Sequence, residues 1–152
     1  MQIHSSYLYG LGDPRVINAL VDECVKTLEE NRIIDKIDTI FYTGLSGAFV
    51  GIPLALRLNL YHCALRKEEA HSPFDIEGIL GNDILIVDDM IDSGSTLDLL
   101  YEEASKMKPR SIRVLLYNSA PDPSVPFDQA PIYYVDLPEG NLFDFTTSIL
   151  GD

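Results

Sequence analysis

The sequence predicts an α/β fold in which an open, mostly parallel sheet is flanked by helices. Short apolar runs rich in β-branched residues alternate along the chain with segments of helical periodicity, which is typical of this class. The run from Ile84 to Val87 contains no polar residue, as expected for a strand that helices cover on both faces. The chain has 152 residues and 46% of them are apolar, so we expect one domain, residues 1–152, with its own core.

The first predicted element is a helix that begins at Asp13 and Pro14. Aspartate is a favoured N-cap, proline suits the first helical turn, and apolar residues then recur at helical spacing from Val16 to Leu28. Five apolar runs are predicted strands: residues 39–43, 61–66, 84–87, 112–117 and 132–135. Two further helices are predicted at residues 48–58 and 96–107, and two loops, rich in Pro, Asp, Ser or Gly, at residues 67–82 and 119–131.

Charge and cysteine content narrow the class of protein. The chain has 11 Lys and Arg against 24 Asp and Glu, a formal net charge of −13, which argues against a general nucleic-acid binder. Cys24 and Cys63 stand alone, which disfavours a disulfide framework or a structural zinc site. The N-terminus does not resemble a signal peptide, and the longest apolar run is far shorter than the ~20 residues that span a bilayer. We therefore expect a cytoplasmic protein without membrane or nucleic-acid partners.

The strongest candidate site follows the apolar run 84–87. Ligands of open α/β sheets bind beyond the carboxyl ends of the strands, and here three acids are followed by a turn that leads into a helix. The acids are Asp88, Asp89 and Asp92, and the turn is Ser93, Gly94, Ser95 and Thr96. Free N–H groups and hydroxyls at a helix N-terminus suit one phosphate, and carboxylates suit a diol or a divalent cation. The pattern therefore predicts a sugar-phosphate site, the alternative being that Asp92 only caps the helix.

Two further corners carry candidate residues. Gly44 and Gly47 stand between a strand and a helix, where their backbone N–H groups can approach an anion such as pyrophosphate. A purely structural turn is the alternative, and a nucleophile elbow is disfavoured because Ala48 stands where glycine is needed. Arg66 and Lys67, two of the 11 basic residues, follow the strand at 61–66 and are further candidates for pyrophosphate, unless they are solvated strand-end charges.

The segment ILIVDDMIDSGSTL, residues 84–97, resembles the phosphoribosyl-pyrophosphate signature of the type I phosphoribosyltransferases, with Ser93 in place of a threonine. The resemblance implies that family's fold, with a small hood and a short flexible lid. It also implies that Asp88 and Asp89 bind the ribose hydroxyls and Mg²⁺, and that Asp92 faces the nucleobase as proton acceptor or donor. By the same resemblance, Ser93, Gly94, Ser95 and Thr96 hold the 5′-phosphate.

The other corners resemble this family as well. The turn at residues 43–47 is similar to its pyrophosphate loop, which implies contacts from Leu45, Ser46 and Gly47 and a cis peptide at Gly44-Leu45 or its neighbour. Many members have Lys or Arg where this chain has Leu45. Residues 64–71 are similar to the catalytic lid, with Arg66, Lys67 and His71 as possible ligand contacts.

The tail YYVDLPEGNLFDF, residues 133–145, resembles the end of small microbial xanthine-guanine and hypoxanthine phosphoribosyltransferases. This implies that Leu142 and Phe143 contribute to a hood over a purine, although a late aromatic residue can equally be core. Asn118 aligns with the region that recognises the base, and its amide can donate or accept. Tyr7 and Tyr9 are open between covering the base and packing on the first helix.

Together these patterns and the resemblance imply a magnesium-dependent phosphoribosyltransferase that uses phosphoribosyl pyrophosphate and a nucleobase, with a purine favoured, in nucleotide salvage. Family membership also implies a homodimer or higher homo-oligomer. Two alternatives stay open. One is a sensor of phosphoribosyl pyrophosphate or a nucleotide, which Leu45 and the short lid favour, and the other is an orotate-type transferase, which rests on Arg66, Lys67 and His71.

Overall fold

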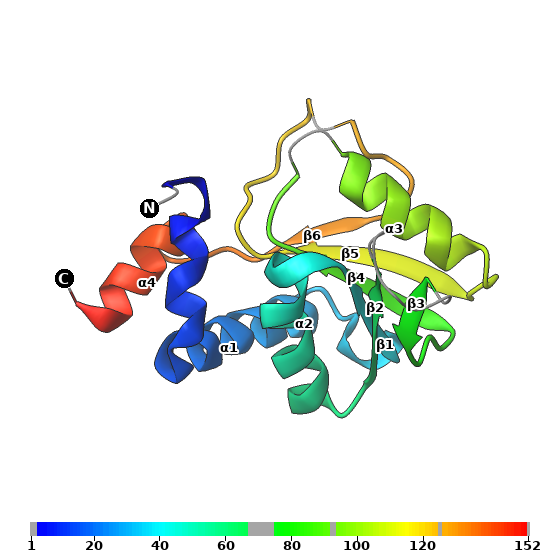
Figure 1. Cartoon of the computed structure of the whole chain (residues 1–152), viewed down its shortest axis with the longest axis horizontal. Helices are drawn as coiled ribbons and strands as arrows, with labels where there is room; N and C mark the ends of the chain where they lie inside the picture. Colours follow the sequence, from blue (N-terminus) through cyan, green and yellow to red (C-terminus); the bar gives the residue numbers. More distant parts are fainter. Residues whose placement is uncertain (1–2, 67–74, 92–93, 125, 152) are drawn as a thin grey trace.

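The computed structural model describes residues 3–66, 75–91, 94–124 and 126–151 (Figure 1). Its centre is a six-stranded sheet of order β3-β2-β1-β4-β5-β6. The strands are β1 (Thr39–Tyr42), β2 (Tyr61–Leu65), β3 (Ile76–Gly78), β4 (Asp83–Asp88), β5 (Ser111–Leu116) and β6 (Ile132–Tyr134). Neighbouring strands are parallel except for β3, which pairs antiparallel with β2 at one edge. The predicted open, mostly parallel sheet is confirmed.

Helices and 3₁₀ helices connect these strands. They are η1 (Ile3–Gly12), α1 (Pro14–Glu30), η2 (Ile34–Lys36), α2 (Gly44–Leu58), α3 (Ser95–Ser105) and α4 (Leu142–Leu150). Helix α1 begins where predicted, and the Asp13 carboxylate accepts a hydrogen bond from the backbone N–H of Arg15 at 2.8 Å. Helix α2 begins four residues before the predicted Ala48, because Gly44, at φ +67°, turns the chain directly into the helix. In the described ranges, no helix combines the length and apolar character needed to cross a membrane.

The core lies on both faces of the sheet, as the uninterrupted apolar run at β4 predicted. Ile84 and Ile86 face one way, against Leu97, Leu100 and other apolar residues of α3. Alternate residues of β4, including Val87, face the other way, where they meet α1, α2 and α4 (Figure 1). All four apolar residues of β4 are fully buried, so the strand that carries the candidate acids is the most constrained part of the sheet.

Strand β3 and helix α4 were not predicted, and neither were the 3₁₀ helices η1 and η2. Strand β3 lies within the predicted loop 67–82, and only its pairing with β2, from Leu65 opposite Ile76 to Cys63 opposite Gly78, makes it a strand. Helix α4 lies in the tail and is capped by Asn141, whose side-chain oxygen accepts from the N–H of Asp144 at 2.8 Å.

The N-terminal η1 packs against both α1 and α4, and these elements form one end of the molecule (Figure 1). The approach of η1 to α4 is so close that a methyl group at Gly10 would collide with the Thr146 side chain. Segments from both ends of the described chain therefore pack together here, and η1 is the part that the sequence left open.

Candidate functional site

The candidate site lies where the parallel strands β1, β4 and β5 end, at one edge of the sheet. Helix α2 begins directly after β1, and the predicted acids end β4. The Ser46 hydroxyl donates a hydrogen bond to Asp88 Oδ1 at 3.2 Å, so the structure joins two of the three corners that the sequence singled out. Parallel strands place their carboxyl ends side by side, which explains why residues 42 positions apart meet here.

Asp88 and Asp89 form a buried pair at this edge, with 6% and 7% of their surfaces exposed. Their backbone carbonyls accept hydrogen bonds from the N–H groups of Tyr117 at 3.2 Å and Asn118 at 2.7 Å, which continue the pairing of β4 with β5. Burial, together with the negative charge of Asp89, raises the pKa of Asp88 from its ordinary 3.8 to about 7, although the hydrogen bond from Ser46 acts in the opposite direction. The pair is thus held in place by β5, and its burial disfavours the ionised form of Asp88.

This pair also fits the predicted Mg²⁺. Magnesium is usually held by one or two carboxylates, with waters and substrate oxygens completing its octahedral shell, so a set of three protein ligands is not required. No cluster of three or more His, Cys, Asp or Glu suited to a metal occurs in the part of the chain that the structure describes. Asp88 and Asp89 would hold the ion, since a cation relieves the repulsion between two buried carboxylates.

The N-terminus of α2 is open at the same edge. Its N-cap, Thr43, donates its hydroxyl to the carbonyl of Leu65 at 2.9 Å, and no described side chain caps the helix. The N–H groups of the first turn therefore keep their capacity for an anion, supported by the helix dipole. The implied cis peptide at Gly44-Leu45 is wrong: the described residues contain no cis bond, and the left-handed Gly44 makes the turn instead.

Helix α3 has a second open N-terminus. Its N-cap is Gly94, which is buried, has φ +86° and offers no side chain for capping. Ser95 and Thr96 are exposed beside it, whereas Asp92 and Ser93 lie outside the described residues. By contrast, α1 and α4, which start elsewhere, are capped by the side chains of Asp13 and Asn141.

Gly47 has a packing role that the sequence did not reveal. It is buried in the first turn of α2, and a Cβ atom built on it would lie 2.8 Å from Tyr42 Cβ and 3.2 Å from the Val87 carbonyl oxygen. Only glycine allows the helix to approach the ends of β1 and β4 this closely. Leu45, in the same turn, points away from this contact and is 66% exposed.

Arg66 lies at the end of β2, and its guanidinium pairs with Glu77 of β3 at 3.1 Å. Its Nε is buried and has no hydrogen-bond partner within the described ranges. Lys67 and His71, the other predicted lid residues, fall outside those ranges. The structure thus shows an ion pair for Arg66 and does not bring it into contact with Asp88 or Ser46.

The predicted base-binding residues gather where α4 begins. Asn118 Oδ1 accepts a hydrogen bond from the N–H of Leu142 at 2.8 Å, which ties the end of β5 to the hood. Leu142 is fully buried in the core, whereas Phe143 is 55% exposed. Tyr9, in the neighbouring η1, is 72% exposed. Phe143 of α4 and Tyr9 of η1 are therefore exposed aromatic side chains, whereas Leu142 belongs to the core.

Tyr117 was missed as a site residue. It is fully buried at the end of β5, and its hydroxyl donates to the carbonyl oxygen of Ser46 at 2.5 Å. The only signal in the sequence was an aromatic residue directly after an apolar strand.

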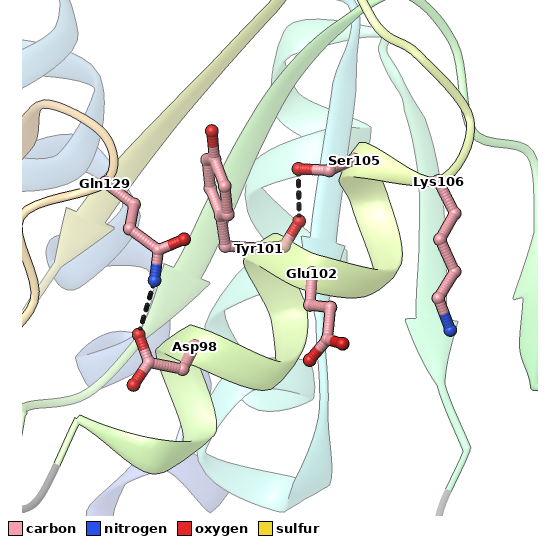
Figure 2. A pocket seen from close by; sticks show the side chains of 6 residues that line it. All are labelled: Asp98, Tyr101, Glu102, Ser105, Lys106 and Gln129. Atoms are coloured by element: carbon pink, nitrogen blue, oxygen red, sulfur yellow. Dashed lines mark hydrogen bonds between the residues drawn. The ribbon is translucent and has the colours of Figure 1, made fainter.

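An open cavity of about 410 Å³ lies along the outer face of α3 (Figure 2). Its lining is Asp98, Tyr101, Glu102, Ser105, Lys106 and Gln129. Asp98 accepts a hydrogen bond from Gln129 at 2.7 Å, and Ser105 donates to the Tyr101 carbonyl at 2.7 Å. Of the predicted site residues that the structure describes, none lines this cavity.

Comparison with solved structures relates the fold to known proteins. An adenine phosphoribosyltransferase from Saccharomyces cerevisiae superimposes with a TM-score of 0.65 and 22% identity, over 81% of this chain and 80% of that one. An orotate phosphoribosyltransferase from Aeropyrum pernix gives 0.64 and 15%, over 82% and 72% of the chains. A second orotate phosphoribosyltransferase, from Francisella tularensis, gives 0.60 and 15%, over 87% and 77%.

No protein-family model matches the sequence, and no curated protein matches it. The relationship is therefore carried by the arrangement of the sheet and its helices, which is shared with enzymes for different nucleobases. The chain has the fold of the type I phosphoribosyltransferases.

Proposed function

We propose that residues 1–152 form a magnesium-dependent phosphoribosyltransferase that converts phosphoribosyl pyrophosphate and a nucleobase into a nucleoside monophosphate and pyrophosphate. The observation that carries the proposal is the edge of the sheet, where two helices without side-chain caps flank the buried pair Asp88 and Asp89. Two anion sites with carboxylates between them match a sugar that bears a phosphate at one end and pyrophosphate at the other.

Each half of the substrate has its own set of residues in this proposal. The turn that leads into α3, with Ser93, Gly94, Ser95 and Thr96, would bind the 5′-phosphate. The first turn of α2, with Leu45, Ser46 and Gly47, would bind pyrophosphate, assisted by Arg66 and Lys67 from the end of β2. Asp88 and Asp89 would hold the ribose hydroxyls between them. The open N-termini of α2 and α3 support this division.

In the reaction, the bond from ribose C1 to the pyrophosphate oxygen breaks as a bond from C1 to a base nitrogen forms. Asp88 and Asp89 stabilise the positive charge that develops on the ribose ring, since they are buried and held in place at the carboxyl end of β4. Asp92 takes the proton that the base nitrogen gives up. Bound Mg²⁺ supplies positive charge against the departing pyrophosphate.

We propose a purine as the base and nucleotide salvage as the role. The exposed ring of Phe143 on α4 and that of Tyr9 on η1 offer apolar surface to a base, and Asn118 anchors this hood to β5. The Saccharomyces cerevisiae protein of the same fold is an adenine phosphoribosyltransferase. We extend the proposal to a homodimer or higher homo-oligomer, as the resemblance to the family implies.

The test is pyrophosphate release from phosphoribosyl pyrophosphate and Mg²⁺ with adenine, hypoxanthine, guanine, xanthine, orotate or uracil. We expect release with a purine, and we expect Asp92→Ala to reduce turnover much more than substrate binding, because its role is in the proton transfer. Equal losses in turnover and binding would contradict the role of Asp92. Release with orotate alone would replace the purine assignment.

A second candidate function, a sensor that binds phosphoribosyl pyrophosphate without turnover, is favoured by Leu45. Leu45 is exposed at a position where many family members have Lys or Arg, and its side chain carries no charge that could bind pyrophosphate. No release of pyrophosphate with any of the bases, together with calorimetry that still shows binding of phosphoribosyl pyrophosphate, would favour the sensor.

Leu45→Lys is expected to increase the affinity for pyrophosphate about fivefold, because an ammonium group would join the open N-terminus of α2. Titration calorimetry with magnesium pyrophosphate measures the change. The matched control is Leu56→Lys, which adds the same charge at another exposed position of α2, about 16 Å further along the helix. An equal gain in both variants would mean that overall charge, and not the turn, governs binding.

A further inference from the structure

A buried tyrosine lies behind the turn that we assign to pyrophosphate. Tyr117 follows β5 directly and has no exposed surface. Its backbone N–H donates to the carbonyl of Asp88 at 3.2 Å, and its hydroxyl donates to the carbonyl of Ser46 at 2.5 Å. Tyr117 therefore contacts the backbone of both the acid pair and the first turn of α2.

The contacts continue from the backbone into side chains. Ser46, whose carbonyl accepts from Tyr117, donates its own hydroxyl to Asp88 Oδ1 at 3.2 Å. The next residue, Gly47, lies against β1 and the Val87 carbonyl with no space for a methyl group. The peptide between Ser46 and Gly47 is thus held on one side by tight packing and on the other by the Tyr117 hydroxyl.

We infer that Tyr117 is a positioning residue that fixes Ser46, and through it Asp88, for phosphoribosyl pyrophosphate; the inference rests on the proposed function. The hydrogen bond to the Ser46 carbonyl limits rotation of the first turn of α2, and it polarises the peptide units of that turn. The N–H groups of the turn are held in one direction, as an anion site requires. Without the hydroxyl, the turn and the Ser46 side chain gain freedom together.

The alternative is that Tyr117 is only a core residue whose hydroxyl makes a structural hydrogen bond. It would be equally buried in that role, but it would affect only the stability of the protein. The two roles differ in what a variant without the hydroxyl changes. Removing a structural hydrogen bond lowers the melting temperature alone. Removing a positioning contact also raises the KM for phosphoribosyl pyrophosphate, because the first turn of α2 and the Ser46 hydroxyl lose their fixed direction.

Tyr117→Phe keeps the ring and removes only the hydroxyl. We expect kcat/KM for phosphoribosyl pyrophosphate to fall about tenfold, mostly through KM, the size of one well-made hydrogen bond.

The matched control is Tyr133→Phe on β6. Tyr133 is half-buried and packs against the same core cluster as Tyr117, so its variant makes the same chemical change within the same layer. The Tyr133→Phe variant is expected to leave the KM for phosphoribosyl pyrophosphate unchanged. Ser46→Ala and the double variant Ser46→Ala/Tyr117→Phe complete a cycle in which the two losses are less than additive if Tyr117 acts through Ser46.

Equal kinetic behaviour of the Tyr117→Phe and Tyr133→Phe variants, or additive losses in the cycle, would overturn the inference. A wild-type protein that releases no pyrophosphate with any base would instead count against the proposed function. In that case calorimetry with phosphoribosyl pyrophosphate and Mg²⁺ decides the role of Tyr117. Weaker binding by Tyr117→Phe but not by Tyr133→Phe supports positioning, and equal binding by both rejects it.

Discussion

Asp88→Asn is expected to make the protein more stable and to reduce the proposed transferase activity by about 10²–10³-fold. The loss of activity follows because a neutral amide cannot stabilise positive charge on the ribose as a carboxylate can. The gain in stability follows because Asp88 is buried beside Asp89, and an amide removes the repulsion between them. Asparagine has nearly the same shape, and its Oδ1 can still accept the hydrogen bond from Ser46.

The gain in stability of the Asp88→Asn variant should be larger at high pH than at low pH. The pKa of Asp88 is raised in the folded protein from 3.8 to about 7, so the folded state binds the more protons between these values. Wild-type stability therefore falls as the pH rises through this window, and the repulsion is fully present above pH 7. We expect the variant to gain about 2 kcal/mol at pH 8, or roughly 5 °C in melting temperature, and much less at pH 5.

Thermal unfolding at pH 5 and pH 8, together with pyrophosphate release, measures both effects. The control is Asp35→Asn, which neutralises an exposed aspartate in η2 and is expected to change neither. A variant that unfolds like the wild type at pH 8 would show that the acid pair is not strained by its charge. Retention of activity within tenfold would remove Asp88 from the ribose site.

Gly47→Ala is expected to destabilise the protein by about 1–3 kcal/mol and to lower kcat/KM about 100-fold. The added methyl group would lie 2.8 Å from Tyr42 Cβ and 3.2 Å from the Val87 carbonyl oxygen. Both belong to the central strands and cannot swing aside, so the first turn of α2 must move. That movement separates Ser46 from Asp88 and widens the proposed pyrophosphate site.

Gly12→Ala is the control for this variant, because a methyl group at Gly12 meets no atom within 4 Å. Denaturant unfolding measures stability, and the KM for phosphoribosyl pyrophosphate measures the displacement of the turn. We expect Gly12→Ala to match the wild type in both. An alanine at position 47 that lowers stability but leaves KM intact would show that the turn tolerates displacement and that its geometry is not part of the site.

The parts of the fold that were predictable are those whose signal is local. The apolar run of β4 indicated a strand covered on both faces, and the position of Asp88 after it indicated the functional edge. The contact of Ser46 with Asp88 agrees with two corners that were predicted from their own residues. In each case the sequence carries the information within about ten neighbouring positions.

The parts that were missed depend on partners that are distant in the sequence. Strand β3 has three residues, and its conformation depends on β2. Asn118 is a predicted base contact, and the sequence did not indicate that its side-chain oxygen also accepts from the start of α4, 24 positions away. Tyr117 was not predicted as a site residue, and its hydrogen bond to Ser46 spans 71 positions. Hydrophobic patterns and secondary-structure propensities do not reveal such pairs, because neither partner carries a distinctive local sequence signal.

The packing of η1 on α4 has a consequence for the order in which the protein assembles. Residues 3–12 leave the ribosome early, whereas residues 142–150 follow after the whole sheet has been synthesised. The sheet, α2 and α3 can form before then, and η1 can already pack against α1, but its contact with α4 must wait until α4 has been synthesised. The end of the molecule formed by η1, α1 and α4 is therefore completed last, although one of its parts is made first.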